Sequence, residues 1–153
     1  VVAALGHSGL PASRLEIEIT ETALLQDTEA TIAVLYELRQ LGLSIAMDDF
    51  GTGYSSLGYL RKFPFDKIKI DKSFTLGLPD RAVSLAIVRA MMGLGVNLGM
   101  ITTAEGVETE EQLAALRAEG CTEVQGYLFS PARPAGEIAA LLSRMRGQTR
   151  VVA

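Results

Sequence analysis

Polar residues that could do chemistry recur near the ends of short apolar runs in this sequence. They are Glu18, Glu21, Asp48, Asp49, Lys69, Asp71, Glu105, Glu108 and Gln125. Carboxylates held close together repel one another, so a cluster of them is stable only with cations between them. Because the sequence has one histidine and one cysteine, the ligands would all be oxygen atoms, which favours Mg²⁺, Mn²⁺ or Ca²⁺.

The adjacent residues Asp48 and Asp49 could serve two ions, with one carboxylate bridging them. Two hard cations about 3.5–4 Å apart are the usual clamp for in-line attack on phosphorus. Lys69 beside them would orient the water or neutralise charge on the phosphoryl group. The pattern therefore predicts hydrolysis of a phosphoester.

Each of these residues also has a structural interpretation. A single acid after a strand is commonly a helix cap or a solvated loop residue, and we assign Glu16 and Asp66 to that class. Glu21 and Glu108 could likewise cap the helices that follow them. Burying Asp48-Asp49 unpaired would be costly, which favours a functional role. Lys69 either points inward to a charged partner or outward on a polar face, and alternation alone does not decide this.

Strands and helices alternate along the chain. Runs rich in β-branched residues predict strands at 15–20, 43–47, 67–70, 96–103 and 124–129. About five such strand-and-helix units indicate a parallel sheet in one α/β domain. Two architectures remain open, an open doubly wound sheet or part of a (β/α)₈ barrel, since a complete barrel needs about 250 residues. In either, the carboxyl ends of the strands would bring the polar residues together.

Helical spacing and capping residues predict the helices. One helix opens at Asp27 and closes at Gly42, and another spans 81–94, ends at Gly95 and should be well buried because it is apolar almost all round. Thr109 and Gln112 form a capping box for a helix that Gly120 closes. The remaining two are expected at 3–9 and along the stripe 138–145.

Composition excludes several classes of protein. The 153 residues are 48% hydrophobic and 21% charged, which is enough apolar material for one core and excludes a disordered chain. A net charge of −4 argues against non-specific DNA binding, and no apolar run approaches the roughly 20 residues of a membrane span. The lone Cys121 fits a reducing cytoplasm, and Val1 in place of Met suggests a cut within a longer protein.

Five motifs, taken together, closely resemble the EAL domain of bacterial cyclic-di-GMP phosphodiesterases. In order they are Glu18-Ile19-Thr20-Glu21, Asp48-Asp49-Phe50-Gly51-Thr52-Gly53-Tyr54-Ser55-Ser56-Leu57, Lys69-Ile70-Asp71, Ala104-Glu105-Gly106-Val107-Glu108-Thr109 and Gln125-Gly126-Tyr127-Leu128-Phe129-Ser130. The resemblance runs from about residue 2 to about residue 144. It implies a modified (β/α)₈ TIM-type barrel that opens cyclic-di-GMP to linear pGpG with two Mg²⁺ or Mn²⁺ ions, whereas Ca²⁺ is expected to inhibit.

The resemblance also implies a role for each site residue. Glu18 and Asp48 would bind one metal, and Asp48, Asp49 and Glu105 the second. Lys69 would hold the attacking water, with Asp71 and Gln125 around it, and Glu108 would belong to the same polar shell. Glu21 would steady the loop that contains Gly51, Thr52 and Gly53, and in the family that loop couples dimer contacts to metal binding.

The chain departs from the family at its beginning. It lacks the Glu-Ala-Leu signature, whose glutamate is a metal ligand, and an asparagine ligand on the next strand. We therefore expect residues 1–153 to be the C-terminal portion of one EAL domain, an incomplete barrel whose unpaired edges favour a homodimer or other self-association. The alternatives are an inactive module that binds cyclic-di-GMP or a partner protein, and a dimerisation fragment.

Overall fold

The computed structural model describes residues 1–25, 28–53 and 57–148. Five strands form one parallel sheet whose order, β1-β2-β3-β4-β5, follows the order of the chain. They are β1 (Glu16–Thr20), β2 (Ser44–Phe50), β3 (Lys67–Ile70), β4 (Ile101–Ala104) and β5 (Glu123–Val124). A doubly wound sheet would reverse its strand order at a switch point. The sequential order is instead that of a β/α barrel.

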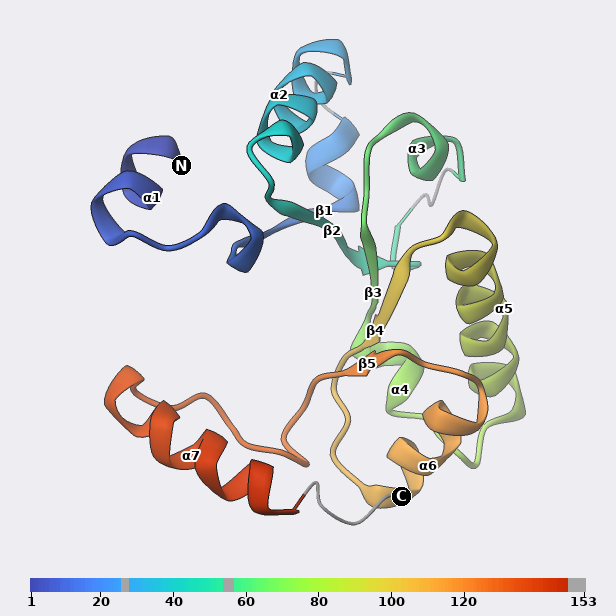
Figure 1. The fold of residues 1–153 in the computed structure, drawn as a ribbon. Helices are drawn as coiled ribbons and strands as arrows, with labels where there is room; N and C mark the ends of the chain where they lie inside the picture. The colour runs from blue at the N-terminus through green and yellow to red at the C-terminus, as the bar shows by residue number, and fades with distance from the viewer. Residues whose placement is uncertain (26–27, 54–56, 149–153) are drawn as a thin grey trace.

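Helices surround the sheet, and most of them cover one side of it. They are α1 (Val2–Ser8), α2 (Thr28–Gln40), α3 (Leu57–Lys62), α4 (Lys72–Thr75), α5 (Ala82–Leu98), α6 (Glu110–Ala118) and α7 (Ala135–Gln148), with the short 3₁₀ turns η1 (Ala12–Arg14) and η2 (Glu21–Leu25). In Figure 1 they follow one another in an arc around the strands, with α1 and α7 at its two ends, and in both views α7 stands apart from the other helices. The arc is therefore an open part of a barrel wall. Within the described ranges, no helix is long and apolar enough to cross a membrane.

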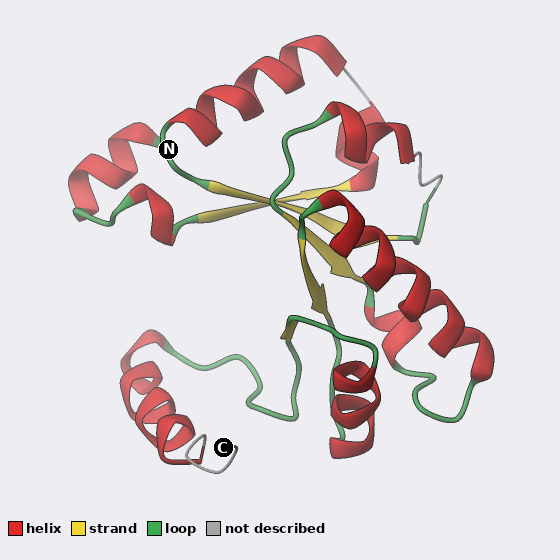
Figure 2. Cartoon of the chain, turned by 45° about the vertical axis from the view of Figure 1, so that its right-hand side comes forward, coloured by secondary structure: helices red, strands yellow, loops and turns green. Residues whose placement is uncertain are grey.

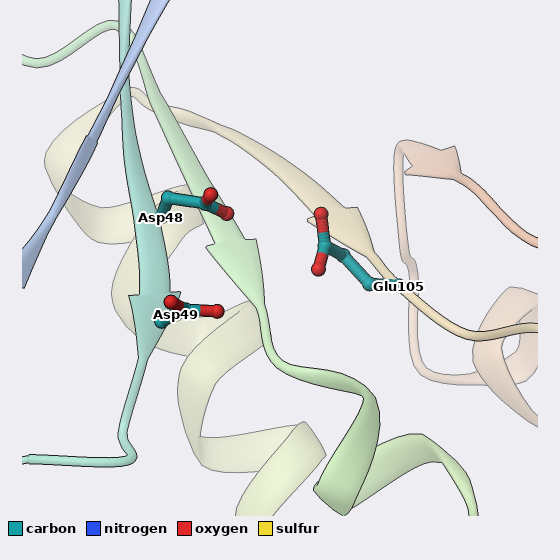
Figure 3. Close-up of side chains that lie close together, drawn as sticks. All are labelled: Asp48, Asp49 and Glu105. Carbon is teal, nitrogen blue, oxygen red and sulfur yellow. The ribbon is translucent and has the colours of Figure 1, made fainter.

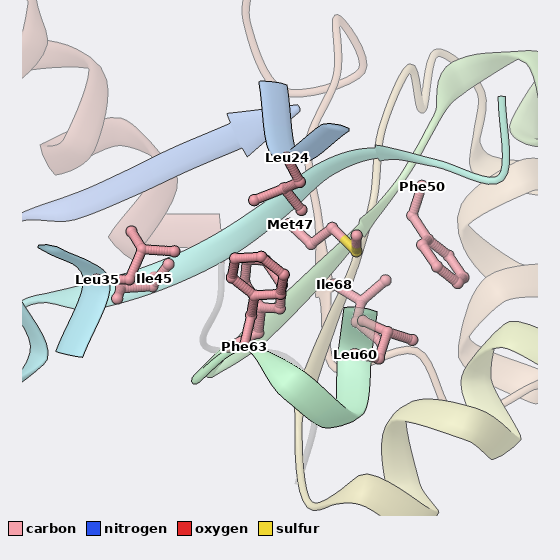
Figure 4. Close-up of a cluster of buried hydrophobic side chains, with 9 residues drawn as sticks. Leu24, Leu35, Ile45, Met47, Phe50, Leu60, Phe63 and Ile68 are labelled. Carbon is pink, nitrogen blue, oxygen red and sulfur yellow. The ribbon is translucent and has the colours of Figure 1, made fainter. Parts of the chain in front are cut away.

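Alternation along the strands divides apolar from polar side chains. Ile45 and Met47 of β2 and Ile68 of β3 are buried against α2 and α3, in the cluster that Figure 4 shows. A second buried cluster joins the sheet to α5 and α6. Because successive strand residues point to opposite faces, Asp48 and Lys69 lie on the other, inner face of the sheet.

Predicted helix ends are partly confirmed. The capping box of Thr109 and Gln112 is present, with Gln112 N–H donating to Thr109 Oγ1 at 3.2 Å, and Gly42 and Gly120 follow their helices as expected. Asp27, the expected cap of α2, lies outside the described residues.

The boundary between α5 and β4 was predicted wrongly. We expected the helix to stop at Gly95 and a strand to begin at residue 96, but α5 runs to Leu98 and β4 begins at Ile101. Gly95 is buried within the helix, where a Cβ would overlap the methyl group of Thr102. Gly99 instead closes the helix with φ 68°, a left-handed conformation that glycine adopts without strain.

Two further expectations are wrong. Helix α5 is not well buried, because only Val88, Met92 and Gly95 are buried while Val83 and Val96 are exposed. The last strand is far shorter than residues 124–129, since β5 holds only Glu123 and Val124 and the chain then turns. Apolar composition predicted both segments, but α5 packs on the outside of the sheet with one face exposed, and β5 is the last strand in the sheet order.

Candidate metal centre

The polar side chains predicted to meet come from the carboxyl ends of neighbouring strands. Thr20 of β1 pairs with Asp48 of β2, and Ile70 of β3 pairs with Ala104 of β4, directly before Glu105. In this register the ends of four strands stand side by side. Figure 3 shows Asp48 and Asp49 reaching from β2 toward Glu105, whose carboxylate points back at them.

Lys69 lies at the centre of this group. Its side chain is buried, and its Nζ lies 2.7 Å from Glu105 Oε1, 2.8 Å from Glu18 Oε1 and 3.0 Å from Asp48 Oδ1. Burial alone would lower the pKa of Lys69, but the hydrogen bonds to Glu105, Glu18 and Asp48 outweigh it and raise the pKa above its ordinary value. Lys69 is thus the interior lysine with charged partners, which settles the alternative that the sequence left open.

A β-bulge places both aspartates on one face. Between β2 and β3 the register passes from Met47↔Ile68 to Phe50↔Ile70, so β2 contains one extra residue. Asp49 absorbs it with φ 54°, a left-handed conformation that is strained for any residue with a side chain. The bulge also returns Phe50 to the buried cluster. Without it, Asp49 would point toward the helices.

The carboxylates suit a hard cation. Asp48, Asp49 and Glu105 each offer one oxygen atom, and these three atoms all lie within 4.8 Å of one another. Glu18 lies next to this set because it forms an ion pair with Lys69, which also pairs with Asp48 and Glu105. An all-oxygen, partly buried set of carboxylates is the chemistry that Mg²⁺, Mn²⁺ and Ca²⁺ prefer. The residues present therefore fit a metal centre.

Glu21 lies beside the loop after β2. Its side chain is buried, and a Cβ at Gly53 would lie 3.3 Å from Glu21 Oε2. The same loop folds back on Asp49, whose carbonyl accepts hydrogen bonds from Thr52 N at 3.2 Å and Thr52 Oγ1 at 2.9 Å. Residues 54–56 of the predicted loop motif lie outside the described residues. The described part of the loop is in contact with Glu21, where its predicted role requires it.

Asp71 is placed differently from the rest. Its Oδ1 accepts from Ser73 N at 3.0 Å, so that Asp71 caps the short helix α4. Burial would raise the pKa of Asp71, but the hydrogen bonds from Ser73 lower it below its ordinary value. The contacts described for Asp71 are with α4 and not with the carboxylates around Lys69.

Glu108 and Gln125 line a hollow beside the carboxylates. Its volume is about 240 Å³, and its wall consists of Lys72, Glu105, Gly106, Glu108, Gln125, Gly126 and Tyr127. The two loops of this wall are joined by hydrogen bonds, from Val107 N to Gln125 O at 3.1 Å and from Leu128 N to Val107 O at 3.0 Å. Glu105 belongs to both the hollow and the metal centre, so a ligand in the hollow would lie next to the metal.

A second polar group, which the sequence did not predict, lies on the same face of the sheet, nearer the amino end of β3. Lys67 Nζ lies 2.9 Å from Glu16 Oε2 and 2.7 Å from Glu123 Oε2, and Ser44 and Thr103 donate to these two carboxylates at 3.0 Å. The spacing of two residues between Lys67 and Lys69 was the available indication, because it places both on one face. Glu16 is therefore part of a partly exposed ion-pair network on the inner face of the sheet, not a solvated loop acid or a helix cap.

Asp66 likewise joins elements instead of capping a helix. Its Oδ2 accepts from Ile45 N at 3.1 Å, and its Oδ1 lies 2.9 Å from Arg39 Nη2. Asp66 thus links β2 to α2.

The parallel β/α fold of this chain has an acidic centre at the carboxyl ends of its strands. This arrangement is typical of β/α-barrel proteins, which place their active sites at this edge. The chain belongs to the EAL domain family, whose sequence profile matches residues 1–132. The fold class expected from the sequence, a TIM-type barrel that is incomplete here, is confirmed, because the similar solved structures are EAL domains.

Known relatives agree with this assignment. The crystal structure of the EAL domain of Mycobacterium smegmatis DcpA is 40% identical with a TM-score of 0.87, over 93% of this chain and 64% of that one. The cyclic di-GMP phosphodiesterase NbdA of Pseudomonas aeruginosa is 46% identical over 94% of this chain but only 18% of NbdA. The chain thus spans about a fifth or less of such relatives.

Metal and nucleotide occur together in solved structures of one similar protein. Klebsiella pneumoniae BlrP1, 37% identical with a TM-score of 0.79 over 84% of this chain and 33% of that one, is described as a manganese/cy-diGMP complex. A calcium/cy-diGMP complex of the same protein has also been solved. Both divalent ions are hard cations of the kind that the carboxylate set here would accept.

Proposed function

We propose that residues 1–153 are the C-terminal portion of one EAL domain and carry most of the site with which it hydrolyses cyclic-di-GMP to linear pGpG. The observation that carries the proposal is the charge around Lys69. One ammonium faces the carboxylates of Glu18, Asp48 and Glu105, with Asp49 beside them. Four formal negative charges against one positive charge call for further cations. The relatives named as cyclic di-GMP phosphodiesterases support the choice of substrate.

The proposed ligand sets follow from this grouping. Glu18 and Asp48 would hold one Mg²⁺ or Mn²⁺ ion, and Asp48, Asp49 and Glu105 a second, with Asp48 shared. When bound, the ions would lower the pKa of water and neutralise charge on the phosphodiester. The bulge at Asp49 serves this purpose, since it turns a second carboxylate to the inner face.

Other residues of the chain would bind and orient the reactants. Lys69, whose Nζ is placed among the carboxylates by ion pairs with Glu18, Asp48 and Glu105, would hold the attacking water. Gln125 and Glu108 would contact substrate in the hollow they line, and Asp71 would act through the helix that it caps. The oxygen of water bonds to phosphorus, the 3′ oxygen leaves with a proton, and the product is a linear dinucleotide with a 5′-phosphate.

Glu21 would maintain the position of Asp49 through the loop that includes Gly51, Thr52 and Gly53. The supporting contacts are those of Glu21 with Gly53 and of Thr52 with the Asp49 carbonyl. A loop that is held at both points keeps the strained backbone of Asp49 in place.

Thermal unfolding with and without metal tests the metal centre. Mn²⁺ at 100 times its Kd should stabilise the wild-type chain by about 2.7 kcal/mol and leave the double variant Asp48→Asn/Asp49→Asn unchanged. Equal shifts of Tm in the two proteins would remove the metal claim.

Chromatography tests the reaction. The chain is incubated with cyclic-di-GMP and Mn²⁺, with Lys69→Ala as the control. Formation of pGpG by the wild type and none by the variant would mean that the residues present suffice for hydrolysis and that Lys69 takes part in it. Absence of product from both would mean that the glutamate and asparagine ligands of the family are also required, whereas equal product from both would contradict the role proposed for Lys69.

We also propose that the chain self-associates in the cytoplasm, most simply as a homodimer. Among the described residues, strands β1 and β5 each pair on one side only, and the apolar residues Tyr127 and Phe129 are exposed near β5. Unpaired edges and exposed apolar surface both favour association. Light scattering on a gel-filtration column should give a mass above that of one chain, and a monomer at all concentrations would contradict this.

A further inference from the structure

Gln112 makes more contacts than a helix cap requires. In a capping box its side chain returns to the backbone N–H of the cap residue, and Gln112 Oε1 does accept from Thr109 N at 3.1 Å. The same oxygen also accepts from Glu108 N at 2.7 Å, and Nε2 donates to the carbonyl of Thr75 at 3.4 Å. The side chain is buried, so none of these partners has water as a ready substitute.

The two additional partners belong to loops of the metal centre. Glu108 ends the segment 105–108, which begins with Glu105 and lines the hollow. Thr75 ends α4, which follows β3 and therefore Lys69, and its buried hydroxyl donates to the Glu105 carbonyl. Gln112 thus joins α6 to the loop after β4 and to the helix after β3.

The backbone amides of Glu105 and Val107 within the segment 105–108 bond to other elements, and Leu128 N donates to Val107 O. Glu105 N donates to Ile70 O at 3.0 Å, and Val107 N donates to Gln125 O at 3.1 Å. Only the end at Glu108 depends on α6, and the bond to Gln112 is the one described for the Glu108 amide. Losing it would free that end of the segment while leaving the strands intact.

We infer that Gln112 is a positioning residue that sets the place of Glu105 and Glu108 for metal and substrate. This inference rests on the proposed function of the same site. Gln112 touches neither the carboxylates nor the hollow and acts through the backbone of 105–108. Residues that orient metal ligands in this way typically contribute 10–100-fold to metal affinity.

The chain provides a matched control. Thr109→Ala removes the other half of the capping box and, like Gln112→Met, costs about 1 kcal/mol of helix stability. It leaves the Gln112 side chain free to bind Glu108 N and Thr75 O. Gln112→Glu retains an acceptor for both amides at a helix N-terminus that favours negative charge, but it loses the bond donated to Thr75.

Hydrogen exchange on the metal-free chain gives the first measurement. We expect Gln112→Met to speed exchange of the Glu105 and Val107 amides, whose acceptors are Ile70 O and Gln125 O, well beyond the effect of Thr109→Ala. Gln112→Glu should return both rates toward those of the wild type. Equal rates in Gln112→Met and Thr109→Ala, or no recovery in Gln112→Glu, would overturn the inference.

Mn²⁺ affinity by calorimetry gives the second measurement. Gln112→Met should weaken the Kd about 10–100-fold, whereas Thr109→Ala should leave it unchanged. Faster exchange with an unchanged Kd would show that Gln112 holds the loop without serving the metal, and would overturn its role. A wild-type chain that binds no Mn²⁺ would refute the proposed function instead, and the exchange rates would then decide the structural part alone.

Discussion

Replacing Lys69 by methionine isolates the electrostatics of the metal centre. Methionine fills a similar volume without a charge and leaves three carboxylate oxygens that each lay 2.7–3.0 Å from the lost ammonium. Removing one partner of a buried ion pair costs about 3–5 kcal/mol. Because Glu18 is 45% exposed, water screens part of the repulsion, and we take the lower limit of about 3 kcal/mol.

The loss should appear in the Tm of the metal-free chain. For a chain of this size each kcal/mol corresponds to roughly 2–4 °C, so that Tm should fall by about 6–12 °C. Mn²⁺ at 100 times the wild-type Kd supplies about 2.7 kcal/mol to the wild type, and the variant, which has no competing ammonium, should bind Mn²⁺ more tightly and gain more at the same concentration. The ion would occupy the region of charge that the ammonium neutralised, so Mn²⁺ should restore most of the lost stability.

Lys67→Met is the matched control. Lys67 lies two residues earlier on the same strand and face, and it pairs with Glu16 and Glu123 at similar distances. Its loss should also lower Tm, but the Mn²⁺ shift should equal that of the wild type. A Mn²⁺ shift in Lys69→Met no larger than in Lys67→Met, or a fall in Tm below about 2 °C, would refute the reasoning.

Four further outcomes are expected. Asp49→Gly relieves the strain of φ 54°, which should add about 1 kcal/mol to the free energy of unfolding while abolishing the Mn²⁺ shift in Tm. Lys67 lowers the pKa of Glu123 below its ordinary value of 4.5. The ion pair therefore stabilises the fold fully above pH 4.5, and this stabilisation is lost as the pH falls through the folded-state pKa of Glu123. Tm measured below pH 4.5 should fall more steeply in the wild type than in Glu123→Gln. Gly126→Ala places a Cβ against the Val107 backbone, and circular dichroism melting should show a loss of several °C. Ca²⁺ should raise Tm without supporting pGpG formation, because its looser coordination fits two-metal geometry poorly, and equal turnover in Ca²⁺ and Mn²⁺ would contradict this.

The order of strands and the place of the site could be predicted from the sequence. Parallel strands all end at one edge, so an acid after each of several strands implies a shared site whatever the helices do. Glu18, Asp48 and Glu105 were selected on this ground, and the structure brings all three to Lys69. Which of these residues bind metal stays a prediction.

Features that depend on neighbouring elements could not be predicted. Alternation places Asp48 and Asp49 on opposite faces, and only the pairing of β2 with β3 reveals the extra residue that reunites them. Gln112 was found as a capping residue because that role is local, but its bond to Thr75 spans 37 positions. Gly95 and Gly99 both resemble helix stops, and the contact of Gly95 with Thr102 selects the second.

The two lysine groups of the inner face show why charge balance, rather than the presence of acids, identifies the site. Lys67 meets two carboxylates, and the hydroxyls of Ser44 and Thr103 donate to them, so one negative charge remains and it is well solvated by hydrogen bonds. Lys69 meets three carboxylates with Asp49 close by, which leaves an excess of three. A strained residue is retained to add the last of these charges. Such an excess would destabilise the fold unless cations bind there. We therefore expect the carboxylates around Lys69, and not those around Lys67, to bind metal.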